Sequence, residues 1–168
     1  MSFFKSKLNI WLLVSFLIAG ILSLWLYVKL TTEVGDIHYD SSVDSKEFSP
    51  CGRYKIYQYF RVGTYYQGGE RTIKNTIISR IKMDGLPDNG LLTVRFIVNC
   101  KGESGYYRTK MVDNDLKEVK VPNSISSHLY SLISELDGWV PGKINGESMD
   151  SYAQIVFKVQ NGKVTDIF

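Results

Sequence analysis

The chain has 168 residues and a formal net charge of +3. This length is enough for one domain of ordinary size beside a short extra segment, and too small for two large cores. Its Lys and Arg residues are scattered among acids, so no basic stripe indicates a nucleic-acid-binding protein and no nucleic-acid partner is expected.

An uncharged apolar segment occupies residues 10–28. As a helix it would be roughly 28 Å long, which is close to the hydrocarbon thickness of a bilayer. The alternative is a cleavable signal peptide, whose apolar core would be about 7–15 residues long and would be followed by small residues. Lys29 and Leu30 follow directly here, so we predict an uncleaved transmembrane anchor within residues 1–30.

The charges that flank the apolar segment predict its orientation. Lys5 and Lys7 precede it, whereas acids such as Glu33 and Asp36 follow it. Because Lys and Arg are retained on the cytoplasmic side, we expect the N-terminus inside the cell and the rest of the chain outside.

Small residues repeat every fourth position on one face of the predicted anchor, at Ser15, Ala19 and Ser23. Such stripes allow close helix packing in membranes, which would suit a homodimer or a contact with another membrane protein. The alternative is that the stripe arises by chance.

Residues 31–50 are polar, acidic and rich in Ser, and are predicted to form a linker before one domain at residues 51–168. The aromatic, partly alternating residues 53–62 predict a strand, and the spacing of Ile73, Ile77 and Ile81 predicts a short helix. Strict alternation over 91–99 predicts a strand that turns back as a second hairpin arm at 103–112.

Four apolar residues from Leu129 to Leu136, together with Ile125, follow the pattern of one helix face. A further strand is predicted at 150–159, and Asn161-Gly162 predicts a tight turn into a last strand at 163–168. The expected fold is therefore α+β, with a mostly antiparallel sheet and two helices packed on one face.

Several segments in this order resemble the C-terminal domain of TonB, the periplasmic energy transducer. They are Gly68-Gly69-Glu70 before a helix, the strand 90–99 followed by Lys101-Gly102, the tract 139–146 that begins Trp-Val-Pro-Gly-Lys, and the strand that ends at Phe157. The resemblance covers a little over half of the chain. It implies a single-pass inner-membrane protein with a periplasmic domain.

Two departures from that family concern energy transduction. TonB-like proteins carry a long Pro-rich spacer, whereas residues 1–49 of this chain contain no Pro. The family's anchors also carry a His that engages a proton-driven motor, whereas His38 and His128 both lie outside the predicted anchor.

In the resembled family the last strand pairs with an extended receptor segment, which is a case of β-augmentation. The resemblance places this role on the strand 151–159, and we name its partner-binding residues as Tyr152, Gln154, Val156 and Lys158. The alternative is a closed sheet, in which the strand 163–168 covers that edge. Trp139 and Pro141 are further candidates for partner contact, although such a Trp more often seals a helix end against the core.

Cys51 and Cys100 are the two cysteines of the chain, and an oxidising compartment would allow them to form a disulfide. Two unrelated thiols are the alternative. The sequence lacks a CxxC motif, a phosphate loop and a Ser or Cys with a partnering His motif, so no enzyme activity, metal or cofactor is expected.

The leading hypothesis is a membrane-anchored, TonB-like protein that binds another protein by strand pairing. Its partner would be an outer-membrane receptor in TonB-dependent transport, or motor subunits in the inner membrane. The alternatives are an inner-membrane adaptor or scaffold without energy transduction, and an unrecognised periplasmic enzyme.

Overall fold

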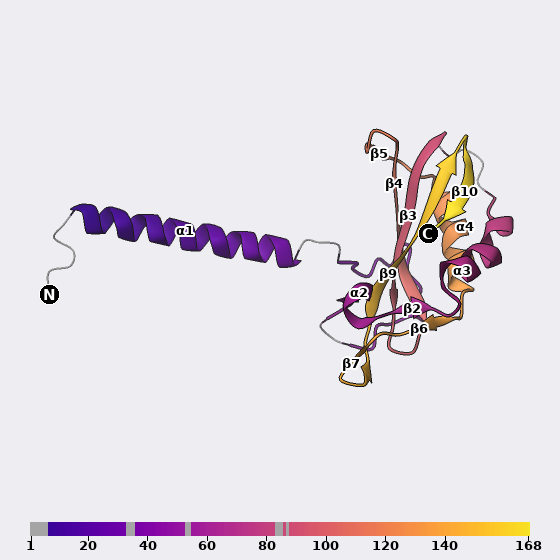
Figure 1. Ribbon diagram of the computed structural model, residues 1–168, viewed down its shortest axis with the longest axis horizontal. Helices are drawn as coiled ribbons and strands as arrows, with labels where there is room; N and C mark the ends of the chain where they lie inside the picture. Colours follow the sequence, from indigo (N-terminus) through magenta and orange to yellow (C-terminus); the bar gives the residue numbers. More distant parts are fainter. Residues whose placement is uncertain (1–6, 33–35, 53–54, 83–85, 87) are drawn as a thin grey trace. The chain divides into compact units, whose positions relative to one another are not determined.

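The computed structural model describes residues 7–32, 36–52, 55–82, 86 and 88–168. The chain divides into two compact units, Met1–Asp36 and Ile37–Phe168. The first unit holds helix α1 (Lys7–Thr32), which Figure 1 shows as one uninterrupted helix. Its stretch Asn9–Tyr27 has a mean hydropathy of 2.2 and is long and apolar enough to cross a membrane, as predicted.

The second unit contains a mostly antiparallel sheet with the strand order β1-β9-β3-β4-β5, and β10 pairs with β9 as well. The strands are β1 (Tyr57–Gln58), β3 (Asn89–Val98), β4 (Ser104–Val112), β5 (Glu118–Val119), β9 (Ser151–Gln160) and β10 (Lys163–Ile167). The strands predicted at 91–99, 103–112, 150–159 and 163–168 are confirmed. Asn161 and Gly162 both have positive φ angles, 51° and 69°, as a tight hairpin turn requires.

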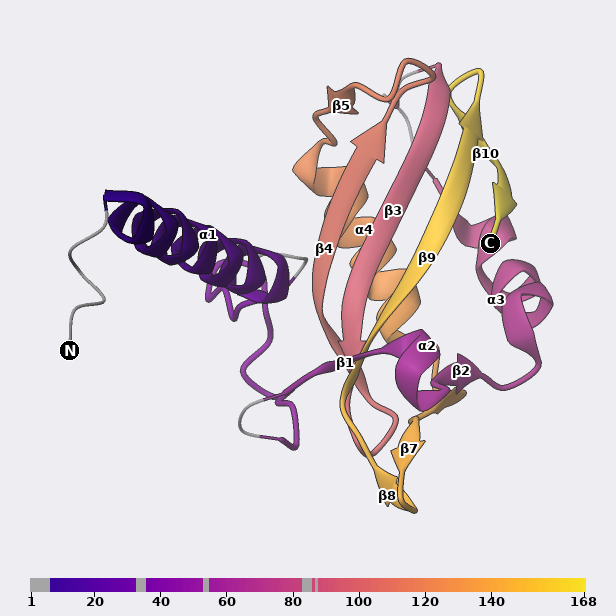
Figure 2. The ribbon, with the colours of Figure 1, turned by 60° about the vertical axis from the view of Figure 1, so that its left-hand side comes forward.

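Two helical segments pack against the sheet. They are α3 (Gly69–Ile77), which continues as the 3₁₀ turn η2 (Ile78–Arg80), and α4 (Asn123–Ser134). In Figure 2, α4 lies behind the sheet and α3 lies beside β10. Both helices were predicted from the spacing of their apolar residues, and the α+β class is confirmed.

The core lies between α4, α3 and one face of the sheet. The predicted inward residues of β3 are fully buried, and those of β9 are at most 4% exposed. The core-facing residues of these two strands are Leu92, Val94, Phe96, Val98, Ala153, Ile155, Phe157 and Val159. Because side chains alternate along a strand, the remaining residues of β3 and β9 point to the opposite face, which we name the open face. It is exposed at Gln154 and Lys158, whereas Ile97 and Tyr152 on the same face are buried.

The predicted strand at 53–62 is wrong over most of its described part. Strand β1 comprises only Tyr57 and Gln58, and residues 59–62 form the short helix α2 (Tyr59–Val62). Gly63 ends this helix with φ 74°, and its N–H donates to the carbonyl oxygen of Tyr59. Residues 53 and 54 lie outside the described part of the chain.

Two small ribbons complete the unit at the end where α2 lies. One pairs β2 (Tyr65–Tyr66) with β6 (Trp139–Val140), and the other pairs β7 (Lys143–Ile144) with β8 (Glu147–Ser148). Figure 2 shows these elements at the lower end of the sheet, opposite β5 at the upper end.

The predicted linker at 31–50 needs a correction, because the second unit begins at Ile37 rather than at Cys51. We name residues 37–50 the strap. Its Asp44 side chain is 1% exposed and forms an ion pair with Arg108 of β4, and its Phe48 ring contacts Tyr106 edge to face. The strap is therefore packed on the domain and is not a free spacer.

Candidate functional site

Strand β9 does not offer a free edge, and the alternative of a sheet closed by the strand 163–168 describes it better. Strand β9 pairs with β3 from Ser151 to Gln160. On its other side β1 pairs with Ser151 and Tyr152, β10 pairs with Phe157–Gln160, and Val156 exchanges two backbone hydrogen bonds with Phe168. Among the described residues, only 153–155 have no strand on that side, so this edge is largely closed.

The residues predicted to bind a partner on β9 therefore have different surroundings. Gln154 and Lys158 are exposed and Val156 is half-buried, and all three point to the open face of the sheet. Tyr152 is only 3% exposed, and the guanidinium of Arg95 lies 4.3 Å from its ring centroid. This tyrosine is a packed residue of the fold.

Trp139 is likewise a core residue. It is 9% exposed, and its ring packs edge to face against Tyr66 and Phe96 at 5.1 and 5.2 Å between centroids. Its indole N–H is buried without a hydrogen-bond partner among the described residues. Pro141 lies between β6 and β7 and is half-buried, so these two residues form part of the packing and not an exposed contact corner.

Strand β4 supplies the free edge instead. Its inner side pairs with β3, whereas on its outer side β5 pairs only with Met111 and Val112. The N–H of Asp113 bonds the carbonyl of Lys117 on the outer side, and alternation then points the N–H and C=O of Thr109 outward as well. Within the described chain no strand covers the outer side of β4 between Ser104 and Lys110.

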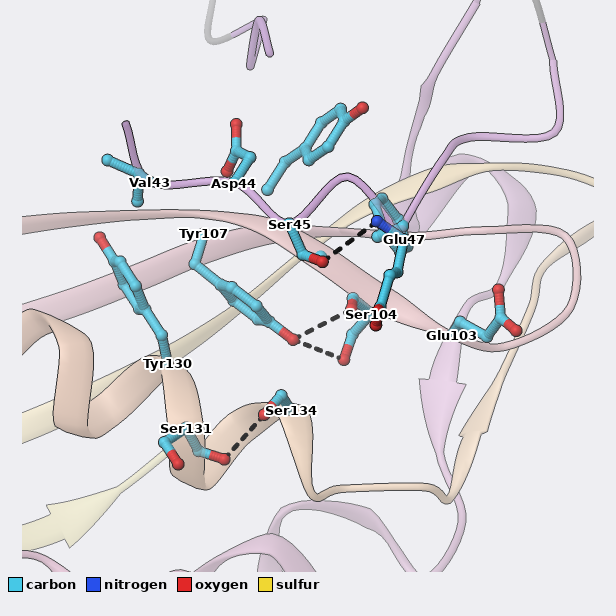
Figure 3. A pocket seen from close by; sticks show the side chains of 13 residues that line it. Val43, Asp44, Ser45, Glu47, Glu103, Ser104, Tyr107, Tyr130, Ser131 and Ser134 are labelled. Carbon is cyan, nitrogen blue, oxygen red and sulfur yellow. Dashed lines mark hydrogen bonds between the residues drawn. The ribbon is translucent and has the colours of Figure 1, made fainter. Parts of the chain in front are cut away.

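This free edge lies in a groove, which we name the edge groove. It consists of two adjoining hollows of about 450 and 740 Å³ that share Val43 and Tyr130 in their walls. Figure 3 shows the first hollow: the strap lies on one side, α4 with Tyr130, Ser131 and Ser134 on the other, and Tyr107 of β4 between them. The second hollow continues along β4 toward Lys110 and Glu118.

The wall that the strap contributes is held by one ion pair. The guanidinium of Arg108 donates to both carboxylate oxygens of Asp44 at 2.8 Å, and it also donates to the carbonyl oxygens of Tyr107 and His38. The hydrogen bonds to Asp44 raise the pKa of Arg108 above its usual value. Arg108 therefore stays charged and fixes the strap to β4.

Two tyrosines of the groove stack on each other. The rings of Tyr107 and Tyr130 lie 5.3 Å apart at 22°, and the Tyr107 hydroxyl donates to the carbonyl oxygen of Ser104 at 3.0 Å. Burial raises the pKa of Tyr107, and burial together with the charge of Asp44 raises the pKa of Tyr106. The phenols of Tyr107 and Tyr106 are therefore neutral at physiological pH and act as hydrogen-bonding and stacking groups.

Cys51 and Cys100 form a disulfide, which joins the end of the strap to the turn between β3 and β4. The carboxylate of Asp150 lies beside it, accepting bonds from the N–H of Gly52 at 2.6 Å and from the N–H of Cys100 at 2.8 Å. Potential metal-ligand atoms of these two cysteines and Asp150 gather within 4.8 Å. The sulfurs are bonded to each other and the carboxylate is engaged, so the cluster is a structural brace.

The small-residue stripe belongs to the first unit. Ser15, Ala19 and Ser23 are all exposed on α1, and the Ser15 hydroxyl donates to the carbonyl oxygen of Leu12 at 2.9 Å. Nothing in this unit covers the stripe among the described residues, so helix packing there stays a prediction.

The sequence reasoning missed the edge groove. It recognised β4 as a hairpin arm but looked for a free edge at the strand 151–159 alone. A signal for this edge is the turn Asp113-Asn114-Asp115, which follows β4. The strand β5 after that turn has only two residues, so most of β4 is left uncovered. Asp44 and Phe48 were missed because they lie in a polar stretch without periodicity.

The comparisons with known proteins give this chain no relative. No protein-family model, no curated protein and no solved structure matches it.

Proposed function

We propose that this chain is a membrane-anchored binding protein that holds an extended segment of another protein against the outer edge of β4. The observation that carries the proposal is the stretch of β4 from Ser104 to Lys110, which lines the edge groove and whose outer side pairs with no strand among the described residues. An extended peptide adds to such an edge through backbone hydrogen bonds, and side-chain pockets beside the strand give selectivity. The role proposed is binding rather than catalysis.

The walls of the groove support a peptide as its occupant. Stacked Tyr107 and Tyr130 offer large surfaces with little conformational freedom to lose, and Ser131 and Ser134 offer hydroxyl groups. The charges change along the groove. Exposed Glu47 and Glu103 lie beside the first hollow, whereas the second has the exposed Lys120 and the pair of Lys110 with Glu118. A bound segment would therefore have a preferred direction.

The anchor and the disulfide support a location outside the cytoplasm. Helix α1 is apolar enough to span a bilayer, and Lys7 lies at its start. Disulfides persist in oxidising compartments, which agrees with the orientation expected from the flanking charges. With the TonB resemblance, these features favour an inner-membrane protein with a periplasmic domain, acting as an adaptor or in TonB-dependent transport.

The test uses the full chain in lipid nanodiscs and peptides selected on it from a random displayed library. Hydrogen exchange is measured at single amides with and without a selected peptide. We expect the amide of Thr109 to gain protection, because it points outward, while the amide of Arg108 is already bonded to β3 and changes little.

Two substitutions at one position provide the control. Thr109→Pro removes the outward N–H and should abolish peptide binding, since edge positions tolerate Pro otherwise. Thr109→Val removes only the side-chain hydrogen bond to Tyr130 and should leave binding nearly unchanged. Selected peptides that protect the amide of Gln154 and leave Thr109 unprotected would refute the proposal.

A further inference from the structure

A group of aromatic side chains is exposed at the end of the second unit where α2 lies. Tyr59, Phe60 and Tyr65 are 43%, 69% and 58% exposed, and the rings of Tyr59 and Phe60 pack edge to face at 5.5 Å. We name these three residues the aromatic patch. Large aromatic side chains exposed together indicate an interaction surface, whereas single exposed apolar residues are ordinary.

Local packing holds the patch outward. Val62, the last residue of α2, is 7% exposed and lies against Gly142, where an added Cβ would come within 2.4 Å of a Val62 methyl group. With Val62 buried, the one-turn helix directs Phe60 away from the core. Tyr59 and Tyr65 also line a hollow of about 700 Å³ whose walls are mainly apolar.

The charged residues nearest to the patch in sequence are cations. Residues 55–69 contain the exposed Lys55 and Arg61 and no Asp or Glu. The next acid, the exposed Glu70, lines the same hollow as Tyr59 and Tyr65. Aromatic rings with neighbouring cations are the composition that favours the headgroup region of a bilayer, where the rings sit at the interface and the cations meet phosphates.

The patch also lies close to the point where the anchor joins the domain. The N–H of Ile37, the first residue of the second unit, is 3.4 Å from the hydroxyl of Tyr152, and the backbone of Tyr152 pairs with Gln58, which directly precedes Tyr59. Helix α1 ends at Thr32. Five residue steps from Thr32 to Ile37 span about 18 Å at full extension.

We infer that the aromatic patch docks on the phospholipid surface of the membrane that α1 crosses. The inference rests on the anchoring proposed above and goes beyond it, because it assigns a second surface and a lipid partner to the domain. A short tether, together with exposed cations and exposed rings near the tether's attachment point, favours a lipid surface over a soluble protein. The edge groove would then remain free for its own partner.

The test compares two positions of similar exposure in the full chain. Phe60→4-fluorophenylalanine labels the patch, and Leu116→4-fluorophenylalanine labels the turn before β5, where Leu116 is 79% exposed. Figure 2 places β5 at the opposite end of the sheet from α2. Fluorine relaxation is measured in nanodiscs that contain a small amount of phospholipid with a gadolinium-chelating headgroup.

We expect a severalfold larger relaxation enhancement at position 60 than at position 116. Adding Arg61→Gln to the Phe60 variant should lower the enhancement in nanodiscs with anionic lipid and change it little in purely zwitterionic ones. Co-elution of the chain with the nanodisc reports the anchoring separately. Loss of co-elution would refute the anchoring, whereas co-elution with equal enhancement at the two positions would overturn the lipid-docking inference alone.

Discussion

The outer edges of β9 and β4 differ in how they are covered. On the side of β9, β1 and β10 occupy the strand's outer hydrogen-bonding groups at both ends, and Ile167 of β10 is buried in the core. On the side of β4, a two-residue β5 covers one end, and the strap lies nearby without pairing. One edge is closed by backbone pairing, and the other is only narrowed by side chains.

The difference shows two ways of protecting an edge. Backbone pairing removes the edge as a template for other strands. A groove with charged and aromatic walls leaves the backbone groups available but restricts what can reach them. If the β4 edge binds a partner, substitutions on the β9 side should affect the free energy of unfolding alone. Substitutions on the β4 side should affect both the free energy of unfolding and the access of a partner segment to the backbone of β4.

The largest effect is expected from the double substitution Cys51→Ser with Cys100→Ser. The two residues are 49 apart in sequence, and opening a loop of that length lowers the free energy of unfolding by about 4 kcal/mol in the chain-entropy model. Native-state hydrogen exchange of β3 amides would measure the loss. Because the disulfide joins the strap to the β3–β4 turn, amide exchange near β4 should rise more than exchange near β9. An equal rise at the two edges would contradict the difference between them.

Opening the closed edge should cost somewhat less. Ile167→Ala empties a site that is 4% exposed, so the free energy of unfolding should fall by about 3 kcal/mol. The Val156 amide, which bonds the carbonyl oxygen of Phe168 at 2.7 Å, should exchange faster. Val164→Ala at a half-buried site of the same strand is the control and should have a smaller effect. An unchanged Val156 amide in the Ile167 variant would show that β10 is not what closes this edge.

Releasing the strap comes next. Asp44→Ala removes the buried partner of Arg108 and should lower the free energy of unfolding by about 2 kcal/mol, since a half-buried guanidinium loses its charge-assisted bonds. Binding of peptides selected on the parent chain should also change. Asp115→Ala breaks an ion pair with Lys117 in which both side chains are 76% exposed, and it should alter stability by less than about 0.5 kcal/mol. Similar effects in the two variants would contradict a packed strap.

The smallest effects concern pH. The hydrogen bond from Lys74 holds the pKa of Asp166 on β10 below its usual value, and the hydroxyl of Ser42 lowers the pKa of Asp40 on the strap. A lowered folded-state pKa gives stability that is complete above the unfolded value of about 3.9 and is lost as pH falls through the folded value. Asp166→Asn and Asp40→Asn should each slightly weaken the dependence of stability on acid pH. Hydrogen exchange measures the effect, at the Val156 amide for Asp166→Asn and at amides near Arg108 for Asp40→Asn.

Much of the fold follows from local patterns in the sequence. The alternation that includes Val94 and Phe96 predicts β3, the repeat that includes Leu129 and Ile133 predicts α4, and Asn161-Gly162 predicts the turn to β10. These signals are readable because each depends on periodicity or on turn geometry within a few residues.

The parts that escaped prediction depend on contacts between distant residues. Aromatic residues at 57–60 favour a strand locally. The pairing with β9 ends after two residues, however, and the next four residues form α2, whose Val62 is buried. Asp44 is 64 positions away from Arg108, and no local pattern reveals that they meet. The free edge lies at β4 and not at β9 for a similar reason, since the order of the strands depends on contacts across the whole sheet.

The disulfide has a mechanical consequence for a tethered domain. The covalent path from the strap to β4 runs through Cys51 and Cys100, so residues 52–99 form a side loop that carries no tension. If α1 anchors the chain and a partner binds β4, as proposed, a load between them would be borne by the strap, the Asp44–Arg108 ion pair and the turn at 100–103. Strand β3, which sits in the centre of the sheet, would be spared the pull.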